Sequence, residues 1–169
     1  MNPATAFSLR PLDDCDLPAL LEVYRACEDF LALGPRPYAS PEMVLGDLAL
    51  SRASGGLFHG ICDGAGSLIG VADWIPNGFE GNPETAFIEL VMIAGTHRHG
   101  GLGRAVVAEI ERRIRLDGRT RRIACGVQVN NRKAQRFWWR CGYRSTRPPE
   151  KMPDHTTALL LCKELDDPA

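Results

Sequence analysis

The sequence predicts a mixed α/β fold. Two apolar segments around a glycine-rich turn predict a β-hairpin in the first half of the chain, and strand and helix patterns alternate in the second half. Between these regions, Phe87–Ala94 is an almost unbroken apolar run, which is typical of a strand covered on both faces. With 169 residues, 44% of them hydrophobic, the chain is long enough to bury a substantial core, and we expect residues 1–169 to form one domain.

The first half of the chain is expected to begin with a short strand, Ala6–Pro11, followed by two helices and the hairpin. Asp14 or Asp16 can cap the first helix, whose apolar face would carry Leu17, Leu20, Leu21, Tyr24 and Cys27. The second helix starts at Ser40–Glu42, with serine as its cap and proline at its first position. The remaining segments are the loop Leu33–Tyr38, the hairpin strands Leu57–Cys62 and Leu68–Ile75 around Asp63–Gly66, and the exposed loop Pro76–Thr85.

In the second half, helices alternate with strands after the central apolar run. A four-residue repeat predicts one apolar stripe along a helix, formed by Leu102, Val106, Ile110 and Ile114. A second helix, which ends at Gly142, has one face made of Ala134, Phe137, Trp138 and Cys141. The strands expected here are Arg122–Val129, Tyr143–Thr146 and Thr157–Cys162.

Composition and residue spacing argue against several classes of protein. No apolar run approaches the roughly 20 residues that a membrane span requires, and the first residues lack the basic and apolar regions of a signal peptide. The six cysteines include no C-x-x-C pair, so we expect reduced and mostly buried thiols. No spacing of cysteine, histidine and carboxylate residues resembles a metal site. These features favour a cytoplasmic protein without a membrane anchor or a metal.

Charge is segregated along the chain. Residues 1–96 hold 4 Lys/Arg against 13 Asp/Glu, and residues 97–169 hold 16 against 8, although the net charge is only −1. Either the two halves form solvated faces that attract each other, or the basic half holds an anionic ligand while the acidic half attracts a cationic one. Nucleic acid is not an expected partner, because no basic stretch is interleaved with aromatic residues that could stack on bases.

A glycine-rich turn, Arg98–Gly103, joins the central strand to the helix that follows it. The start of a helix leaves backbone N–H groups without partners, and the helix dipole places positive charge there. Phosphates commonly bind at such helix ends. The turn therefore predicts that a phosphorylated ligand binds beside the end of the buried strand.

Two motifs occur in order, with a strand between them. Arg98, Gly101 and Gly103 form R-x-x-G-x-G, and the pattern N-x-x-A-x-x-F-x-x-x-x-G-[FY] is formed by Asn131, Ala134, Phe137, Gly142 and Tyr143. With both motifs, the chain resembles the GNAT superfamily of acyl-CoA-dependent N-acetyltransferases over nearly its whole length. The resemblance implies a mixed, mostly antiparallel central sheet with a splayed pair of parallel strands, flanked by helices.

The resemblance also implies acetyl-CoA as a co-substrate. In the family, backbone amides of the first motif cradle the coenzyme pyrophosphate, and the matching residues here are Arg98, His99, Gly100, Gly101, Leu102, Gly103 and Arg104. Glycine suits this task because a Cβ atom would hinder the approach of the phosphate oxygens. The pantetheine arm lies between the splayed strands, where the matching positions are Met92, Ile93 and Ala94. Asn131 matches the family's asparagine near that arm.

Glu89 is the candidate general base. It is the only charged residue in the central apolar run, and an isolated buried carboxylate is costly, so it needs a partner or a polar cavity. Family members often carry a glutamate on this strand that takes a proton from the substrate amine. Alternatively, Glu89 reaches solvent or pairs with an arginine. Many family members place a tyrosine where this chain has Trp138, and an indole cannot supply a proton, so Tyr143 is left as a weak candidate acid.

The function expected from the resemblance is transfer of an acetyl group from acetyl-CoA to a primary amine of a small molecule or peptide, by direct attack in a ternary complex. A non-catalytic acyl-CoA-binding sensor or regulatory module is the alternative, because the tyrosine is missing. A nucleotide-binding domain is disfavoured, since no Walker lysine follows Gly103.

The acceptor and the oligomeric state are less defined. The segments that form acceptor walls in the family supply carboxylates and aromatics that would suit a cationic amine, or that are simply surface residues: Glu28, Asp29, Tyr38, Asp73, Trp74, Phe79, Glu80 and Glu84. We expect a monomer or a homodimer, with the last strand and Trp139 as the potential contact.

Overall fold

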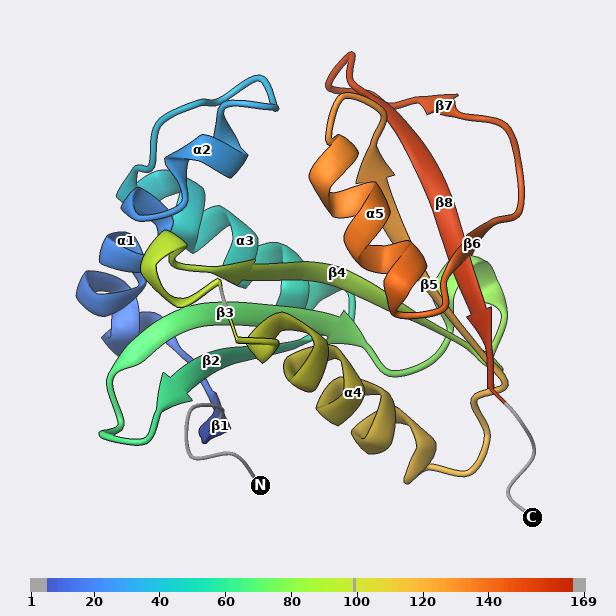
Figure 1. Cartoon of the computed structure of the whole chain (residues 1–169), viewed down its shortest axis with the longest axis horizontal. Helices are drawn as coiled ribbons and strands as arrows, with labels where there is room; N and C mark the ends of the chain where they lie inside the picture. Colours follow the sequence, from blue (N-terminus) through green and yellow to red (C-terminus); the bar gives the residue numbers. More distant parts are fainter. Residues whose placement is uncertain (1–5, 99, 166–169) are drawn as a thin grey trace.

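The computed structural model describes residues 6–98 and 100–165. Along the chain it contains β1 (Phe7–Pro11), the 3-10 turn η2 (Asp14–Asp16), α1 (Leu17–Arg25), α2 (Glu28–Leu31), α3 (Pro41–Ala53), β2 (Leu57–Asp63), β3 (Leu68–Ile75), η3 (Phe79–Gly81), β4 (Thr85–Ile93), η4 (Gly95–His97), α4 (Leu102–Arg115), β5 (Arg122–Gln128), α5 (Arg132–Arg140), β6 (Arg144–Ser145), β7 (Glu150–Lys151) and β8 (Thr157–Glu164) (Figure 1). No helix within these described ranges is long and apolar enough to cross a membrane.

The strands of the described residues form one eight-stranded sheet in the order β1-β2-β3-β4-β5-β8-β6, with β7 paired to β8. Among the described residues, all strand pairs are antiparallel except β4 with β5, which run parallel. Pairing between these two strands ends at Ile88 and Cys125, although β4 continues to Ile93 and β5 to Gln128. Figure 1 shows the two strands separating, with α5 beside the gap. The expected mixed sheet with a splayed parallel pair is therefore confirmed.

Helices cover both faces of the sheet, and each face has its own core. On one face, α4 and α5 cover a cluster that includes Val106, Ile110 and Trp138. On the other, α1 and α3 contribute to a cluster that includes Leu20 and Val44. The predicted four-residue stripe of α4 is buried along its whole length. Each such side chain stabilises the fold by about 1.5–3 kcal/mol relative to an exposed one.

The structure differs from the sequence expectation at several element boundaries. Asp16, one of the two expected cap residues, is the N-cap of α1, but its side chain makes no capping hydrogen bond to that helix. The preceding turn η2 is capped by Asp13, which accepts from Cys15 N at 2.8 Å. The first helix ends at Arg25, and the separate short helix α2 was not expected. The expected strand Tyr143–Thr146 is only two residues long. By contrast, Ser40 caps α3 as predicted, accepting from Met43 N at 3.2 Å.

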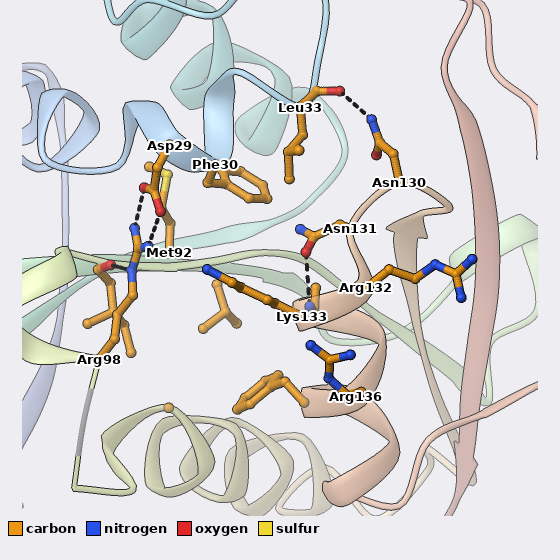
Figure 2. A pocket seen from close by; sticks show the side chains of 15 residues that line it. Asp29, Phe30, Leu33, Met92, Arg98, Asn130, Asn131, Arg132, Lys133 and Arg136 are labelled. Atoms are coloured by element: carbon orange, nitrogen blue, oxygen red, sulfur yellow. Dashed lines mark hydrogen bonds and ion pairs between the residues drawn. The ribbon is translucent and has the colours of Figure 1, made fainter.

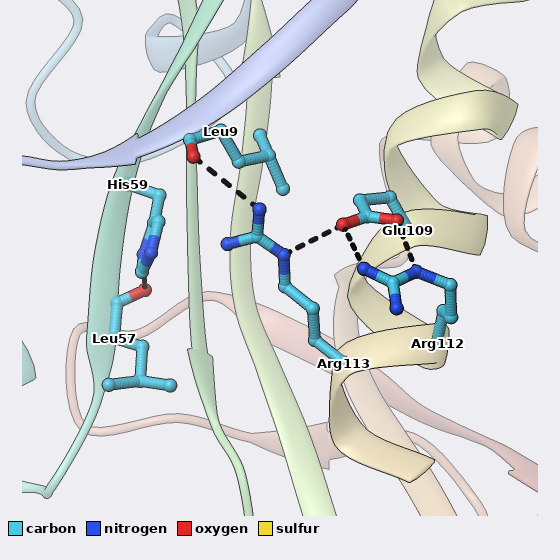
Figure 3. Close-up of polar contacts among 6 residues, drawn as sticks. All are labelled: Leu9, Leu57, His59, Glu109, Arg112 and Arg113. Carbon is cyan, nitrogen blue, oxygen red and sulfur yellow. Dashed lines mark hydrogen bonds and ion pairs between the residues drawn. The ribbon is translucent and has the colours of Figure 1, made fainter. Parts of the chain in front are cut away.

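A polar link joins the first strand to α4 at the sheet face (Figure 3). Arg113 donates from Nη2 to the Leu9 carbonyl at 3.4 Å and from Nε to Glu109 at 2.8 Å. Nearby, the side chain of His59 is buried. Its Nδ1 is 3.1 Å from the carbonyl oxygen of Leu57, and its ring centroid is 4.6 Å from that of Trp74. Burial lowers the pKa of His59, so the fold favours the neutral imidazole.

Candidate active site

The splay between β4 and β5 opens a pocket of about 720 Å³. The end of β4, the first turns of α5, helix α2 and the start of α4 supply its lining (Figure 2). Of the predicted coenzyme residues, the pocket is lined by Met92, Ile93, Arg98, Gly103 and Asn131. The lining does not include Ala94, Gly100, Gly101, Leu102 or Arg104, and His99 lies outside the described residues. The volume is in the range of small-molecule and cofactor sites.

One edge of β4 faces this pocket without a strand partner. Ala94 N donates to Ile69 O at 2.9 Å while Ile93 lies opposite Gly70, so the backbone polar groups of Ile93 point away from β3. In an antiparallel pair, the direction of the backbone polar groups alternates from one residue to the next, so the N–H and C=O groups of Val91 also point away from β3. Because β5 has diverged at this level, these groups face the splay. Both backbone groups of Val91 and the N–H of Ile93 thus offer an edge to an extended ligand, whereas the Ile93 carbonyl accepts from Arg98 and the Ala94 N–H is used within the sheet.

The glycine turn leaves the start of α4 open. Gly100 and Gly101 have φ angles of 77° and 85°, a left-handed conformation that side chains other than glycine rarely adopt. Gly101 is the N-cap residue of α4, and no side chain caps this helix. Gly103 has a packing role: a Cβ atom there would lie 3.1 Å from the Phe137 ring. Among the described residues, the N–H groups of the first turn of α4 therefore have no capping side chain, and Gly103 of this turn lines the pocket.

Arg98 does not offer a free charge to the pocket. Its guanidinium forms a two-pronged ion pair with both carboxylate oxygens of Asp29 on α2, one of them at 2.8 Å from Nη2. Its Nε donates to the Ile93 carbonyl at 2.7 Å. The hydrogen bonds from Arg98 are the main cause of the lowered pKa of Asp29. Arg98 thereby fastens α2 to the end of β4, a contact that the motif alone did not predict (Figure 2).

Asn131 has a structural role at the opposite wall. Its Oδ1 accepts from Ala134 N at 2.9 Å, which caps α5 and explains the asparagine-to-alanine spacing of the second motif. The neighbouring Asn130 donates to the Leu33 carbonyl at 3.1 Å, so the loop after α2 is held near the start of α5.

Glu89 lies at a β-bulge. Asp73 pairs with Leu90 and Trp74 with Ile88, so Glu89 has no opposite residue in β3. Bulges re-aim side chains and are common next to active sites. Glu89 is an exposed residue. It borders a second cavity of about 110 Å³, which it shares with Asp47 and Asp73.

The three carboxylates of this small cavity have raised pKa values. Asp73 is 3% exposed and accepts from Ser51 Oγ at 2.8 Å, and Asp47 accepts from Tyr24 Oη at 2.7 Å. Burial is the main cause of the raised pKa of both groups. For Glu89, partial burial of the carboxyl group is the main cause of its raised pKa, and repulsion from Asp73 and Asp47 raises the pKa further. A carboxylate with a raised pKa is a better base near neutral pH.

Tyr143 is placed away from both cavities. Its side chain is fully buried, and its hydroxyl donates to Glu111 on α4 at 3.1 Å. Lys163 donates to both oxygens of the same carboxylate, at 2.9 and 2.8 Å. Burial and the Glu111 charge raise the pKa of Tyr143. Tyr143 thus belongs to a buried polar network, which gives it no position from which to protonate a ligand in the pocket.

The residues predicted for an acceptor wall do not gather in one place. Among them, only Asp73 borders the cavity of Glu89, and only Asp29 lines the larger pocket. Trp74 is buried, Phe79 stacks on Phe87 at 4.1 Å, and Glu80 pairs with Arg147 at 2.9 Å. Sequence reasoning missed Asp47, Lys133 and Arg136, whose positions depend on how α3 and α5 face the splayed strands. In the ranges 6–98 and 100–165, no group of three histidine, cysteine or acidic residues could hold a metal ion.

Comparison with known proteins identifies the same fold and family. The model of the acetyltransferase (GNAT) family matches residues 17–143. An acetyltransferase from Thermus thermophilus superposes with a TM-score of 0.81 at 23% identity, covering 95% of this chain and 97% of that one. A spermidine N-acetyltransferase from Vibrio cholerae, solved with CoA and spermine, gives 0.72 at 17% identity over 94% and 95% of the two chains. A ribosomal-protein-alanine N-acetyltransferase from Brucella melitensis gives 0.68 at 21% identity over 94% and 99%. No curated protein matches the sequence.

Proposed function

Since the chain belongs to the acetyltransferase (GNAT) family, we propose that it transfers an acetyl group from acetyl-CoA to a primary amine of a small molecule or peptide. The observation that carries the proposal is the pocket in the splay, where the free backbone edge of β4 meets the uncapped start of α4. This combination suits a ligand with an extended amide-containing arm and a phosphate group at one end.

The residues present fit the coenzyme. The N–H and C=O groups of Val91 and the N–H of Ile93 would pair with the pantetheine arm as an added strand would. The open N–H groups after Gly101 would hold the pyrophosphate, because the first turn of α4 has no side-chain cap. Acetyl-CoA supplies the thioester whose acetyl group is transferred. A β4 N–H in the splay would donate to the thioester oxygen as negative charge develops there.

We infer that Glu89 acts as the general base. Glu89 and Leu90 border the small acidic cavity, and the next residue of β4, Val91, lines the larger pocket. Glu89 would accept the proton of the attacking amine, directly or through a water. Asp47 and Asp73 would attract a protonated amine to the same cavity and keep the Glu89 pKa raised. Structural neighbours named for spermidine and for a ribosomal-protein alanine also act on amines, which supports this acceptor class.

A non-catalytic acyl-CoA-binding module is the second candidate. It is favoured by the placement of Trp138 and Tyr143, neither of which lines the larger pocket. A thiol has a pKa of about 8.5, so water can protonate the departing thiolate, and an enzyme does not require a side-chain acid here. For this reason we favour the transferase.

Substitution of Glu89 by glutamine separates the two candidates. For a transferase, Glu89→Gln should lower kcat about 10²–10⁴-fold on an amine found by screening, with little change in the dissociation constant of acetyl-CoA. The acidic limb of the pH–rate profile, which requires the Glu89 carboxylate to be ionised, should also disappear. Glu164→Gln is the matched control, because Glu164 pairs with Arg122 at the opposite end of β5 from the splay. Turnover that survives Glu89→Gln at every pH refutes the base assignment, and a wild-type chain that binds acetyl-CoA but acetylates no amine favours the module.

A further inference from the structure

Three basic residues of α5 line the larger pocket: Arg132, Lys133 and Arg136. Lys133 and Arg136 lie three residues apart on α5, so they share one face of that helix. Figure 2 shows Lys133 reaching across the pocket toward β4 and Arg136 pointing into it from the next turn, whereas Arg132, which also contributes to the lining, extends in the opposite direction. Both Lys133 and Arg136 line the pocket and are solvent-exposed.

These two cations differ from Arg98 in their partners. The charge of Arg98 is balanced by the bidentate pair with Asp29. Among the described residues, no acidic side chain lies within ion-pair distance of Lys133 or Arg136. The Lys133 charge nevertheless reaches the opposite wall: after the larger effect of Arg98, it contributes to the lowered pKa of Asp29. The unbalanced positive charge of the pocket therefore comes from α5.

The start of α4 lies against this part of α5. A Cβ atom at Gly103 would be 3.1 Å from the ring of Phe137, the residue that follows Arg136. A phosphate held by the N–H groups of the first turn of α4 is thus close to the basic face of α5. Charge-assisted hydrogen bonds from lysine and arginine are the strong ones for such an anion.

We propose that Lys133 and Arg136 bind the phosphate groups of the coenzyme, and that Arg98 acts as a clasp that holds α2 to the end of β4. This inference rests on the proposed function, since it assigns the phosphate contacts of the same pocket. It predicts that side-chain recognition of phosphate depends on the second motif's helix, and that the arginine of the first motif contributes mainly to the shape of the pocket rim.

The test is calorimetric titration of CoA into the whole chain and its variants. Lys133→Gln and Arg136→Gln should each weaken CoA binding about tenfold, and the double variant more than either, because each removes one charge-assisted contact. The charge-conserving variants Lys133→Arg and Arg136→Lys should retain most of the affinity. Arg140→Gln is the matched control, since Arg140 is an exposed arginine of the same helix outside the pocket lining, and it should bind CoA like the wild type.

Titration with 3′-dephospho-CoA identifies the phosphate involved. If the loss caused by the glutamine variants persists with this ligand, Lys133 and Arg136 bind the pyrophosphate; if the loss vanishes, they bind the 3′-phosphate. Glutamine variants that bind CoA within twofold of the wild type, or an equal loss in Arg140→Gln, overturn the proposal. These results differ from a failure of the proposed function, in which the wild-type chain itself binds no CoA.

Discussion

Replacement of Tyr143 by phenylalanine tests whether this residue supports the fold or supplies a proton. The ring is fully buried and packs edge-on against Trp138, with 4.9 Å between centroids, so phenylalanine keeps this packing and loses only the hydroxyl. That hydroxyl donates to the Glu111 carboxylate at 3.1 Å. Hydrogen bonds to charged groups contribute about 1.5–3 kcal/mol to the free energy of unfolding.

The lower end of this range applies to Tyr143→Phe. Both oxygens of Glu111 retain Lys163 as a partner, at 2.9 and 2.8 Å, so the substitution does not leave a buried charge unpaired. We expect a loss of about 1.5 kcal/mol, which for a domain of this size lowers the midpoint of thermal unfolding by about 3–6 °C. In the transferase, kcat and its pH dependence should be unchanged, because Tyr143 lines neither cavity.

The assay combines thermal and urea unfolding with steady-state rates below the unfolding transition. Tyr38→Phe is the control for stability, because Tyr38 is 75% exposed, and it should unfold like the wild type. The reasoning is refuted if Tyr143→Phe lowers kcat tenfold or more while the midpoint of unfolding stays the same. That outcome would return Tyr143 to the role of general acid.

Three further experiments probe the clasp, the glycine turn and a buried histidine. A double-mutant cycle with Arg98→Gln and Asp29→Asn, measured by urea unfolding, should give a coupling free energy of about 1 kcal/mol. This value is at the upper end for a partly exposed ion pair, because the contact is bidentate. If the effects of the two substitutions on the free energy of unfolding simply add, the clasp is contradicted. Gly101→Ala should lower the free energy of unfolding by about 1–2 kcal/mol, because Gly101 has a φ of 85°, which alanine rarely adopts. No neighbouring atom obstructs a Cβ atom at this position, so the cost is conformational and not steric. An unchanged midpoint of urea unfolding would show that the turn adapts. The pKa of His59 is lowered in the fold by burial, so the unfolded chain binds the extra proton and stability should fall as pH drops from about 6.5 toward the folded pKa. His59→Gln should remove this part of the pH dependence, and identical slopes for the two proteins would argue against a buried neutral imidazole.

Local patterns were sufficient for the main elements of the fold. The four-residue apolar repeat identified the buried face of α4, and Ser40 followed by proline identified the start of α3. Both features depend on residues within one or two turns of each other, which a sequence displays directly. The two motifs, through the family resemblance, also led to the splayed strands, whose separation beyond Ile88 provides the pocket.

The chemistry of the site depended on contacts between distant segments. Glu89 lies at a bulge, which exists only in the register of β4 against β3. The pairing of Arg98 with Asp29 joins residues 69 positions apart, and the hydroxyl of Tyr143 meets Glu111 on another helix. No local pattern specifies such pairs. The sequence contains the basic residues of α5, but it does not show that they line the pocket opposite β4.

Thermal unfolding with and without acetyl-CoA is the most direct test of the coenzyme pocket in the splay. At one hundred times its dissociation constant, acetyl-CoA should stabilise the fold by about 2.7 kcal/mol, a shift of about 5–11 °C for a domain of this size. Desulfo-CoA should also raise the midpoint, and ATP at the same concentration should leave it unchanged. A midpoint that neither coenzyme form moves at saturating concentration, or that ATP raises equally, would contradict the assignment of the splayed strands to acetyl-CoA.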